Sequence, residues 1–348
     1  MKTKWGVIGS GGIASRRTIP EGIIQTNNAE LTAVYDIDRE ANLRVAEKFG
    51  AQACASEDEL LASGCDIVYI ATPADLHCEQ AIRAARAGKH VFCEKPLGLT
   101  VEESQRIIDA CAEQVVKLGV GFMMRFHAYH QAALKIVREG RLGTPVLGRA
   151  QLSCWYPSIA GAWRQNPQQG GGGSLIDMGG HCIDLLEVFF GPVRKVSCFI
   201  GNLVHNYASE DAAVVLLEFR NGAKGIVDAC FCIPDDSSKN RLELYGSQGS
   251  LLAEGTIGQS EAGEMTAILP DSDKDYDAQQ IRCDGNVLRI QPSPVNTYCA
   301  EVEAFSQAVL DNVKPPVGAA AGLWSQEVLA ACYESARTGQ AVELPLSE

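Results

Sequence analysis

The first third of the chain alternates between short apolar runs and longer stretches with apolar residues at helical spacing. The short runs are bounded by turn residues and predict buried strands at 5–9, 31–35, 66–71, 90–93 and 115–122. The longer stretches predict helices at 12–25, 39–49, 57–63, 76–87 and 101–113. Strands that alternate with helices are typical of βαβ units, so we expect an α/β fold with a doubly wound parallel sheet covered by helices on both faces.

After about residue 123 the pattern changes from alternating elements to a run of strands. A helix, a strand, a Gly- and Gln-rich loop and an apolar helix are expected first, at 127–139, 145–156, 165–173 and 174–190. Strand-like runs without intervening helices follow at 195–201, 212–219, 223–232, 240–246 and 249–255. Turn pairs such as Asn221-Gly222 separate several of these runs, which favours a large, mostly antiparallel open sheet. The chain ends with helices at 298–312 and 321–338 and a short strand.

These patterns predict two domains, in agreement with a length of 348 residues at roughly 150 residues per domain. We expect the parallel sheet in a domain at 1–123 and an α+β domain at 124–348, with the last helices able to pack back on the first domain. The segment 255–295 is polar and irregular, and its pattern predicts no clear element.

The composition excludes several classes of protein. The formal net charge is −13 and no basic run is longer than Arg16-Arg17, so neither nucleic acid nor an anionic membrane is an expected partner. No apolar stretch reaches the 18 or so residues that a membrane span needs. The 13 cysteines are odd in number and form no CxxC pair, which favours reduced thiols and a cytoplasmic protein.

A glycine-rich turn follows the first predicted strand and opens the first predicted helix. Its pattern is G-x-G-x-x-A, formed by Gly9, Gly11, Gly12, Ile13 and Ala14. Gly9 permits a tight turn, Gly11 lets the backbone approach a pyrophosphate, and the helix N-terminus faces the phosphates. In this context the pattern predicts a dinucleotide site in a Rossmann domain.

The ends of two further strands offer coenzyme contacts. Asp36 ends the next strand, 22 residues after the glycine motif, where a carboxylate meets the hydroxyl groups of the adenine ribose. Because a carboxylate there repels a 2′-phosphate, the sequence favours NAD over NADP. Arg39 nearby keeps NADP open, and Asp36 can instead simply open a turn. Ala71-Thr72-Pro73 ends the strand at 66–71, either as a contact to nicotinamide or as a strand-ending turn.

Lys95 is the first candidate catalytic residue. Glu94-Lys95-Pro96 follows the strand at 90–93, which places the lysine at the carboxyl edge of the sheet. Pro96 restricts Lys95 to an extended backbone. An ammonium group beside a substrate hydroxyl stabilises the developing alkoxide. The alternative is a surface ion pair with Glu94.

A second candidate cluster lies at the start of the apolar helix. Asp177, His181 and Asp184 are spaced i, i+4, i+7 and share one helical face. A histidine there can take a hydroxyl proton at neutral pH, and Asp177 can orient it or bind a second hydroxyl. The alternatives are a helix cap with a core histidine, or a metal site, but no third nitrogen or sulfur ligand has suitable spacing and we predict no metal. We expect His127 and His130, near another helix start, on a solvated face.

With these residues in place, the sequence resembles the glucose–fructose oxidoreductase, inositol dehydrogenase and rhizopine-catabolism (Gfo/Idh/MocA) family. The resemblance covers nearly the whole chain, is least in 255–295, and rests on GSGGIA, the block from ATPADLH to EKPLGLT, and WRQNPQQGGGGSLIDMGGHCIDL. It implies that Lys95 is the catalytic lysine, Asp177 a substrate-binding aspartate and His181 the proton-transferring histidine.

The resemblance also implies a function. Members of this family have a Rossmann domain and a C-terminal open sheet whose outer face commonly builds dimers or tetramers, and most act on cyclic polyols, aldoses or nucleotide sugars. We therefore expect an NAD(P)-dependent oxidoreductase that transfers a hydride between nicotinamide and a secondary alcohol or ketone of a sugar, cyclic polyol or sugar derivative. Trp163-Arg164 resembles a common substrate-pocket element, and Arg164 can bind a substrate carboxylate or phosphate. His77 and Glu94 lie in the matching motifs and are assigned to the coenzyme site.

Two other functions fit the same motifs. A hydrolase of this fold holds and recycles NAD, because transient oxidation beside a glycosidic bond acidifies a neighbouring C–H and permits elimination. A sensor binds NAD and sugar without catalysis, although the presence of Lys95, Asp177 and His181 argues against it. Turnover without net NADH distinguishes the hydrolase from the dehydrogenase.

Overall fold

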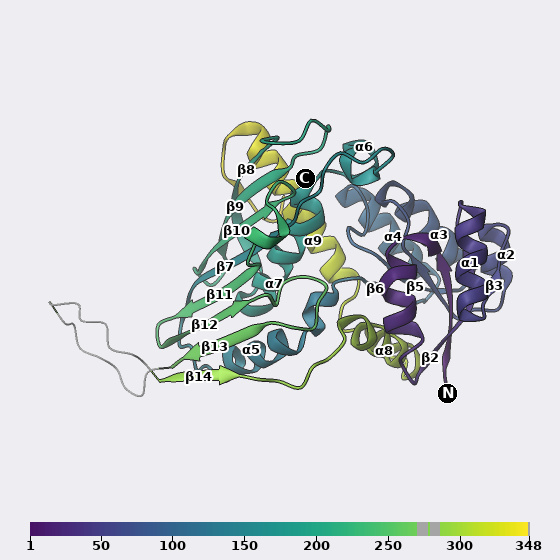
Figure 1. Cartoon of the computed structure of the whole chain (residues 1–348), viewed down its shortest axis with the longest axis horizontal. Helices are drawn as coiled ribbons and strands as arrows, with labels where there is room; N and C mark the ends of the chain where they lie inside the picture. The colour runs from purple at the N-terminus through teal and green to yellow at the C-terminus, as the bar shows by residue number, and fades with distance from the viewer. Residues whose placement is uncertain (270–277, 279–285, 347–348) are drawn as a thin grey trace. The chain divides into compact units, whose positions relative to one another are not determined.

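The computed structural model (Figure 1) describes residues 1–269, 278 and 286–346, and it divides the chain into two units. The first unit comprises Met1–Met123, Ile159–Asp177 and Asn296–Ala330. The second unit comprises Met124–Ser158, Met178–Val295 and Ala331–Glu348. Each unit is therefore built from segments that are distant in the sequence, and 159–177 belongs with the N-terminal sheet.

The first unit contains a six-stranded parallel sheet, which confirms the fold expected from the alternating pattern. Its strands are β1 (Thr3–Ile8), β2 (Ala29–Tyr35), β3 (Gln52–Ala53), β4 (Ile67–Ile70), β5 (His90–Cys93) and β6 (Leu118–Val120). Their order is β3-β2-β1-β4-β5-β6, and every neighbouring pair is parallel. The order changes direction between β1 and β4, as in a Rossmann fold.

Helices connect these strands at nearly the predicted positions. They are η1 (Ser10–Ile23), α1 (Arg39–Phe49), α2 (Glu57–Ala62), η2 (Ala74–Leu76), α3 (His77–Arg86) and α4 (Val101–Glu113). Later parts of the chain add η4 (Trp163–Gln165), α6 (Pro167–Gly170), α8 (Thr297–Leu310) and the first part of α9 (Ala319–Thr338) to this unit. Thr100 Oγ1 accepts a hydrogen bond from the Glu103 backbone N–H at 3.1 Å, which fixes the start of α4 as a capping motif predicts. Among the described residues, no helix combines the length and apolar character needed to cross a membrane.

An aromatic cluster forms the core of the first unit. The Trp5 ring lies 5.6 Å from the Phe92 ring and 6.0 Å from the Phe305 ring, measured between centroids. Trp5 Nε1 also donates a hydrogen bond to Ser306 Oγ at 3.1 Å. Phe305 and Ser306 lie on α8, so burial of these rings holds a helix from the end of the chain against the N-terminal sheet.

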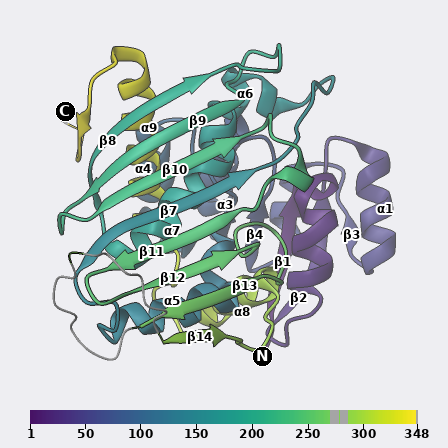
Figure 2. The same cartoon turned by 60° about the vertical axis from the view of Figure 1, so that its left-hand side comes forward.

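The second unit contains a nine-stranded sheet (Figure 2) with the order β14-β13-β12-β11-β7-β10-β9-β8-β15. Its strands are β7 (Pro145–Ser153), β8 (Val193–Gly201), β9 (Ala212–Phe219), β10 (Lys224–Cys230), β11 (Arg241–Gly246), β12 (Gly249–Glu254), β13 (Glu264–Ile268), β14 (Val287–Ile290) and β15 (Val342–Glu343). Only β7 and β10 pair in parallel, and the other pairs are antiparallel. The mostly antiparallel sheet is therefore confirmed, and β13 and β14 lie in the segment whose pattern predicted no element.

The two faces of this sheet differ in polarity. Along β11, Leu242 and Leu244 are buried, whereas Arg241, Glu243 and Tyr245 point to the other face. The buried face packs against α7 (Gly180–Phe190), which in turn contacts α5 (Ala128–Arg138). The short helix η6 (Asp235–Ser237) follows β10 and is exposed. Figure 2 shows the strands in front of α5 and α7. The opposite face is open in the single chain.

Candidate active site

Three adjacent strands of the parallel sheet end at one edge and carry the predicted motifs. β1, β4 and β5 are neighbours, and they lead into Gly9, Ala71 and Glu94 respectively. The strand order changes direction between β1 and β4, and ligands bind outside the carboxyl ends of strands at such a point. The topology therefore brings the glycine turn, the Ala71-Thr72-Pro73 tripeptide and the Glu94-Lys95-Pro96 motif to one edge of the sheet.

The glycine turn has the geometry that a dinucleotide requires. Gly9 has φ +86°, and a Cβ there would lie 2.7 Å from the carbonyl carbon and oxygen of Ala71, so a side chain is excluded. A Cβ at Gly12 would meet nothing within 4 Å, which leaves open space in front of the turn. Ile13 follows in the first turn of η1. The residues present therefore fit the pyrophosphate of a dinucleotide at this helix start.

Asp36 is held at the end of β2 by two backbone groups. Its Oδ2 accepts a hydrogen bond from the Gly11 N–H at 2.7 Å, and its Oδ1 accepts one from the Asp38 N–H at 2.9 Å. Arg39 begins α1 and is exposed. A carboxylate fixed beside the glycine turn can accept hydrogen bonds from ribose hydroxyl groups.

His77 connects the loops that follow β4 and β5. Its Nδ1 lies 2.8 Å from the carbonyl oxygen of Pro96, and its Nε2 lies 3.1 Å from that of Thr72. Thr72 Oγ1 also donates a hydrogen bond to Gln80 Oε1 at 2.6 Å, which fixes the Ala71-Thr72-Pro73 tripeptide. Burial lowers the pKa of His77, so the neutral ring is favoured. His77 thus orders the loop that carries the candidate lysine.

Glu94 is anchored by a tyrosine that no motif marked. Tyr69 donates a hydrogen bond to Glu94 Oε1 at 2.5 Å, and the Tyr69 hydroxyl lies 3.0 Å from Thr18 Oγ1. Burial raises the pKa of the Glu94 carboxyl. Tyr69 is fully buried on β4, so it fixes the residue directly before Lys95 from inside the sheet.

Lys95 pairs with Asp177, 82 residues further along the chain. Lys95 Nζ lies 2.8 Å from Asp177 Oδ1 and donates a second hydrogen bond to the Asp177 carbonyl oxygen at 2.5 Å. The Lys95 side chain is only 10% exposed, so its charge is held in a partly dry site. The structure thus brings together the two predicted residues that bear opposite charges.

Arg164 binds the same carboxylate. Its Nε lies 3.1 Å from Asp177 Oδ1, and its guanidinium carbon lies 4.1 Å from the centroid of the Trp163 ring. Burial alone would raise the pKa of Asp177, but Arg164 and Lys95 together lower it well below its usual range. The ionised form of Asp177 is therefore favoured, and Lys95, Trp163, Arg164 and Asp177 all belong to the first unit.

His181 lies in the first turn of α7, in the second unit. It follows Asp177 by four residues in one unbroken run of helical residues from 174 to 190, in which η5 (Leu175–Gly179) leads into α7. Its side chain is half-buried. The spacing predicted from the sequence is therefore present, and the role of His181 stays a prediction.

Asp184, the third polar residue of that helical face, has a structural partner. Arg125 donates hydrogen bonds to both carboxylate oxygens, from Nε to Oδ2 at 2.8 Å and from Nη2 to Oδ1 at 2.5 Å. Asp184 is buried, and a bidentate pair satisfies a buried carboxylate. Asp184 therefore has a structural partner within the second unit.

The expectation that His127 and His130 lie on a solvated face is wrong. His127 is 0% exposed and His130 is 1% exposed. His127 Nε2 lies 3.1 Å from the Ser260 carbonyl oxygen, and His130 Nε2 lies 3.2 Å from Thr256 Oγ1. The segment after β12 covers both rings, which the helical spacing of the two histidines did not reveal.

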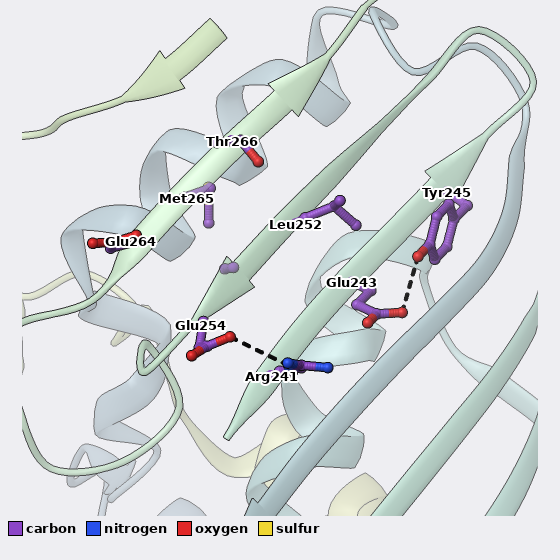
Figure 3. A pocket seen from close by; sticks show the side chains of 9 residues that line it. Arg241, Glu243, Tyr245, Leu252, Glu254, Glu264, Met265 and Thr266 are labelled. Carbon is purple, nitrogen blue, oxygen red and sulfur yellow. Dashed lines mark hydrogen bonds and ion pairs between the residues drawn. The ribbon is translucent and has the colours of Figure 1, made fainter. Parts of the chain in front are cut away.

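A hollow lies on the open face of the nine-stranded sheet (Figure 3). It has a volume of about 320 Å³ and is lined by β11, β12 and β13. Arg241 pairs with Glu254 at 3.4 Å, and the Tyr245 hydroxyl donates to Glu243 Oε2 at 2.9 Å. The hollow contains none of the predicted site residues.

Comparisons with known proteins agree with this geometry. A family model for an oxidoreductase family with an NAD-binding Rossmann fold matches residues 3–122, and one for the GFO/IDH/MocA C-terminal domain matches residues 130–252. The 1,5-anhydro-D-fructose reductase of Ensifer adhaerens is 28% identical over 345 residues, which are 98% of each chain. The D-xylose 1-dehydrogenase (NADP(+)) 2 of Haloferax volcanii is 30% identical over 342 residues, 98% of this chain and 99% of that protein. The crystal structure of an aldose-aldose oxidoreductase from Caulobacter crescentus, complexed with glycerol, is 27% identical, has a TM-score of 0.87, and matches 99% of this chain and 100% of that one.

Both sheets of the protein are thus matched within one group of enzymes. The chain is an oxidoreductase with an NAD-binding Rossmann domain. It belongs to the Gfo/Idh/MocA family, as the sequence motifs indicated.

Proposed function

We propose that this enzyme transfers a hydride between NAD and a secondary alcohol or ketone of a sugar, a cyclic polyol or a sugar derivative. The observation that carries the proposal is the Lys95–Asp177 ion pair at the carboxyl edge of the Rossmann sheet, 2.8 Å between Nζ and Oδ1. The names of the relatives support the substrate class, because one is a reductase of 1,5-anhydro-D-fructose and another a dehydrogenase of D-xylose.

Each predicted residue has a role in this reaction. Bound NAD supplies the nicotinamide carbon that accepts the hydride. Lys95 stabilises the negative charge that develops on the substrate oxygen, and Asp177 holds both Lys95 and a neighbouring hydroxyl group. His181 takes the hydroxyl proton in the oxidative direction. The role of His181 rests on its spacing from Asp177 and on the family resemblance.

We propose NAD rather than NADP as the preferred coenzyme. The Asp36 carboxylate is fixed beside the glycine turn by the Gly11 and Asp38 N–H groups, and a negative charge there repels a 2′-phosphate. Arg39 is exposed at the start of α1 and favours NADP, so the carboxylate and the guanidinium act in opposite directions. Because hydrogen bonds fix the Asp36 carboxylate in place, we expect its repulsion of a 2′-phosphate to outweigh the attraction by Arg39.

A panel assay tests the proposed reaction. The purified protein is incubated with NAD or NADP and a set of inositols, aldoses and nucleotide sugars, and reduced nicotinamide is followed by its near-ultraviolet absorbance. We expect reduction of NAD with one sugar class. Turnover of a glycoside without net NADH would contradict the dehydrogenase and would indicate a hydrolase that recycles NAD.

We further propose that the protein is cytoplasmic and that its chains associate through the open face of the nine-stranded sheet. Every cysteine among the described residues is a free thiol, as expected in a reducing compartment. On the open face, Phe199 is 69% exposed and Leu216 is 48% exposed. A second copy of this chain, as a homodimer or part of a homotetramer, would cover these side chains.

A further inference from the structure

A chain of buried hydrogen bonds ends one residue before the candidate lysine. The Tyr69 hydroxyl donates a hydrogen bond to Glu94 Oε1 at 2.5 Å and lies 3.0 Å from Thr18 Oγ1. The hydride transfer described above uses neither Tyr69 nor Glu94. We propose that Tyr69 is a positioning residue for this reaction, because it keeps Glu94 ionised and the Glu94 carboxylate in turn holds the charged side chain of Lys95 in place. This inference rests on the proposed dehydrogenase function.

Both carboxylate oxygens of Glu94 lie against neighbouring strands. The Glu94 N–H donates a hydrogen bond to the Ile70 carbonyl oxygen at 3.0 Å, which places the residue beside the end of β4. A Cβ at Gly121 would lie 3.0 Å from Glu94 Oε2, so the chain after β6 approaches the second oxygen closely. The Tyr69 ring, whose hydroxyl binds the first oxygen, is fully buried and packs against Phe92 with 5.6 Å between centroids. The carboxyl group is therefore fixed in position by the sheet itself.

Burial and hydrogen bonding act on the Glu94 carboxyl in opposite directions. Burial raises its pKa, whereas the hydrogen bond from Tyr69 lowers the pKa, and so do the charges of Lys95 and Arg164. Tyr69 stays protonated, because burial and the nearby Glu94 raise its own pKa well above the usual value. It is therefore a donor at every pH at which Glu94 titrates, and its hydroxyl favours the carboxylate form.

An ionised Glu94 supplies the charge that the cluster around Asp177 lacks. Lys95 Nζ lies 2.8 Å and Arg164 Nε 3.1 Å from the same atom, Asp177 Oδ1. Two cations on one carboxylate oxygen repel each other, and a second carboxylate that attracts both offsets this repulsion. Because Lys95 is only 10% exposed, water and salt screen these charges little. Loss of the charge on Glu94 would therefore displace the Lys95 ammonium group from the position in which it meets the reacting oxygen.

The other titratable or charged side chains around the Tyr69–Glu94 pair are Cys93, Tyr298, Glu301 and Arg17. Burial and, after it, Glu94 raise the pKa of Cys93 and of Tyr298, so both are neutral in the pH range of the reaction. Glu301 on α8 acts on Tyr69, and the Arg17 guanidinium of η1 lies 5.4 Å from the centroid of the Tyr298 ring. Glu94 is therefore the titratable group on which the Tyr69 hydroxyl acts directly.

The variant Tyr69→Phe tests the proposal through the pH dependence of kcat. It keeps the ring and removes the hydroxyl, so Glu94 becomes protonated, and Lys95 loses its position, at a higher pH. With saturating NAD and the sugar found by the panel assay, the acid limb of kcat should move upwards by about one pH unit, the effect of losing one hydrogen bond to a charged group. Above this limb kcat should return close to the wild-type value.

Two further variants separate this effect from a structural one. Tyr245→Phe removes the same kind of bond, from the Tyr245 hydroxyl to Glu243 Oε2 at 2.9 Å on the nine-stranded sheet, and should leave the acid limb unchanged. Glu94→Gln removes the titrating group and should lower kcat by about tenfold. In the Glu94→Gln background, Tyr69→Phe should shift nothing further. Circular dichroism confirms that each variant is folded.

Several results would overturn the proposal. An acid limb at the same pH in the wild type and Tyr69→Phe, with kcat lowered equally at every pH, would show that Tyr69 has only a structural role. A shift that persists in the Glu94→Gln background would assign the limb to another group, such as His181. Weaker binding of NADH by Glu94→Gln, with kcat unchanged, would instead place Glu94 in the coenzyme site.

If no sugar is turned over, the dehydrogenase function fails, and the ionisation of Glu94 is then measured by itself. In protein isotope-labelled at the glutamate carboxyl carbons, the NMR signal of Glu94 is the one absent from Glu94→Gln. A titration midpoint about one pH unit higher in Tyr69→Phe than in the wild type would support the role of Tyr69. Equal midpoints in the two proteins would refute it.

Discussion

We propose that coenzyme choice depends on a single residue, Asp36. We predict that Asp36→Ser raises the ratio of kcat/KM for NADP to that for NAD by about tenfold, because the repulsion between a carboxylate and a 2′-phosphate is lost. Steady-state kinetics with both coenzymes measure this ratio. Glu40→Gln removes the same charge from the exposed first turn of α1 and is the matched control. An equal change in both variants would show that only the overall charge matters.

Single residues of the site were predictable where a motif marks them. Gly9, Lys95 and Asp177 lie in patterns whose chemistry can be read from neighbouring residues, and the structure brings Lys95 and Asp177 into contact. The sequence offered Glu94 as an ion-pair partner for Lys95, whereas the structure pairs Lys95 with Asp177. Tyr69 was missed because its only signal was an aromatic residue inside an apolar strand. Lys95 and Asp177 are 82 residues apart in the sequence, so no local spacing pattern indicates that they are in contact.

The start of helix α5 carries two buried histidines, the N-cap His127 and His130, whose lowered pKa values make the second unit sensitive to acid. Burial lowers the pKa of His127, and it lowers that of His130 to about 3. The unfolded chain has histidine pKa values near 6.5, so below this pH the unfolded state binds more protons than the folded state. Stability is therefore greatest above about pH 6.5 and falls as the pH is lowered towards 3.

We predict that this effect appears in the variant His130→Gln. Between pH 7 and pH 5 the wild-type protein should lose about 2 kcal/mol of unfolding free energy through His130, and the variant should lack this loss. Urea unfolding at the two pH values measures the difference. The variant is also less stable at pH 7, because the contact to Thr256 changes. The comparison is therefore between the changes in unfolding free energy from pH 7 to pH 5 in the two proteins. If the variant lost as much unfolding free energy between pH 7 and pH 5 as the wild-type protein, the prediction that His130 is neutral in the folded protein would be wrong.

The elements themselves were predicted well where hydrophobic periodicity is strong. Helix 101–113 and strand 212–219 match α4 and β9. The two-residue strand β3 and the four-residue helix α6 are too short for periodicity to show. The expectation of a solvated face for His127 and His130 was wrong, since their burial depends on contacts more than a hundred residues away in the sequence.

At the scale of the whole molecule, the open face of the nine-stranded sheet carries exposed apolar side chains. We predict that the protein is an oligomer in solution and that Leu216→Glu on β9 shifts it towards the monomer, because a buried unpaired carboxylate is costly. Size-exclusion chromatography with light scattering measures the mass. Leu43→Glu places the same charge on exposed helix α1 and should leave the mass unchanged. A wild-type monomer would refute association through this face.

The sequence predicted both sheets of the molecule, but it did not predict which segments of the chain belong to each of the two units. The alternation of strands and helices indicated the parallel sheet, and the run of strands indicated the open one. The loop 159–177 belongs to the first unit, although it is flanked by segments of the second. Its place follows from contacts such as that of Asp177 with Lys95, and a loop without periodicity carries no signal of such contacts. β13 was missed because Met265 and Ala267 are its only buried residues.

The most direct test of whether this site performs hydride transfer uses the variant Lys95→Met. Its turnover and its affinity for NADH are both measured. We predict that kcat falls by about a thousandfold, because the charge on the reacting oxygen loses its stabilising group. The dissociation constant for NADH should stay within about twofold, since the glycine turn and Asp36 are untouched. Lys314→Met, at an exposed position of the first unit, should keep full turnover. Near-normal turnover by Lys95→Met would contradict the assignment of this lysine and, with it, the proposed chemistry of the site.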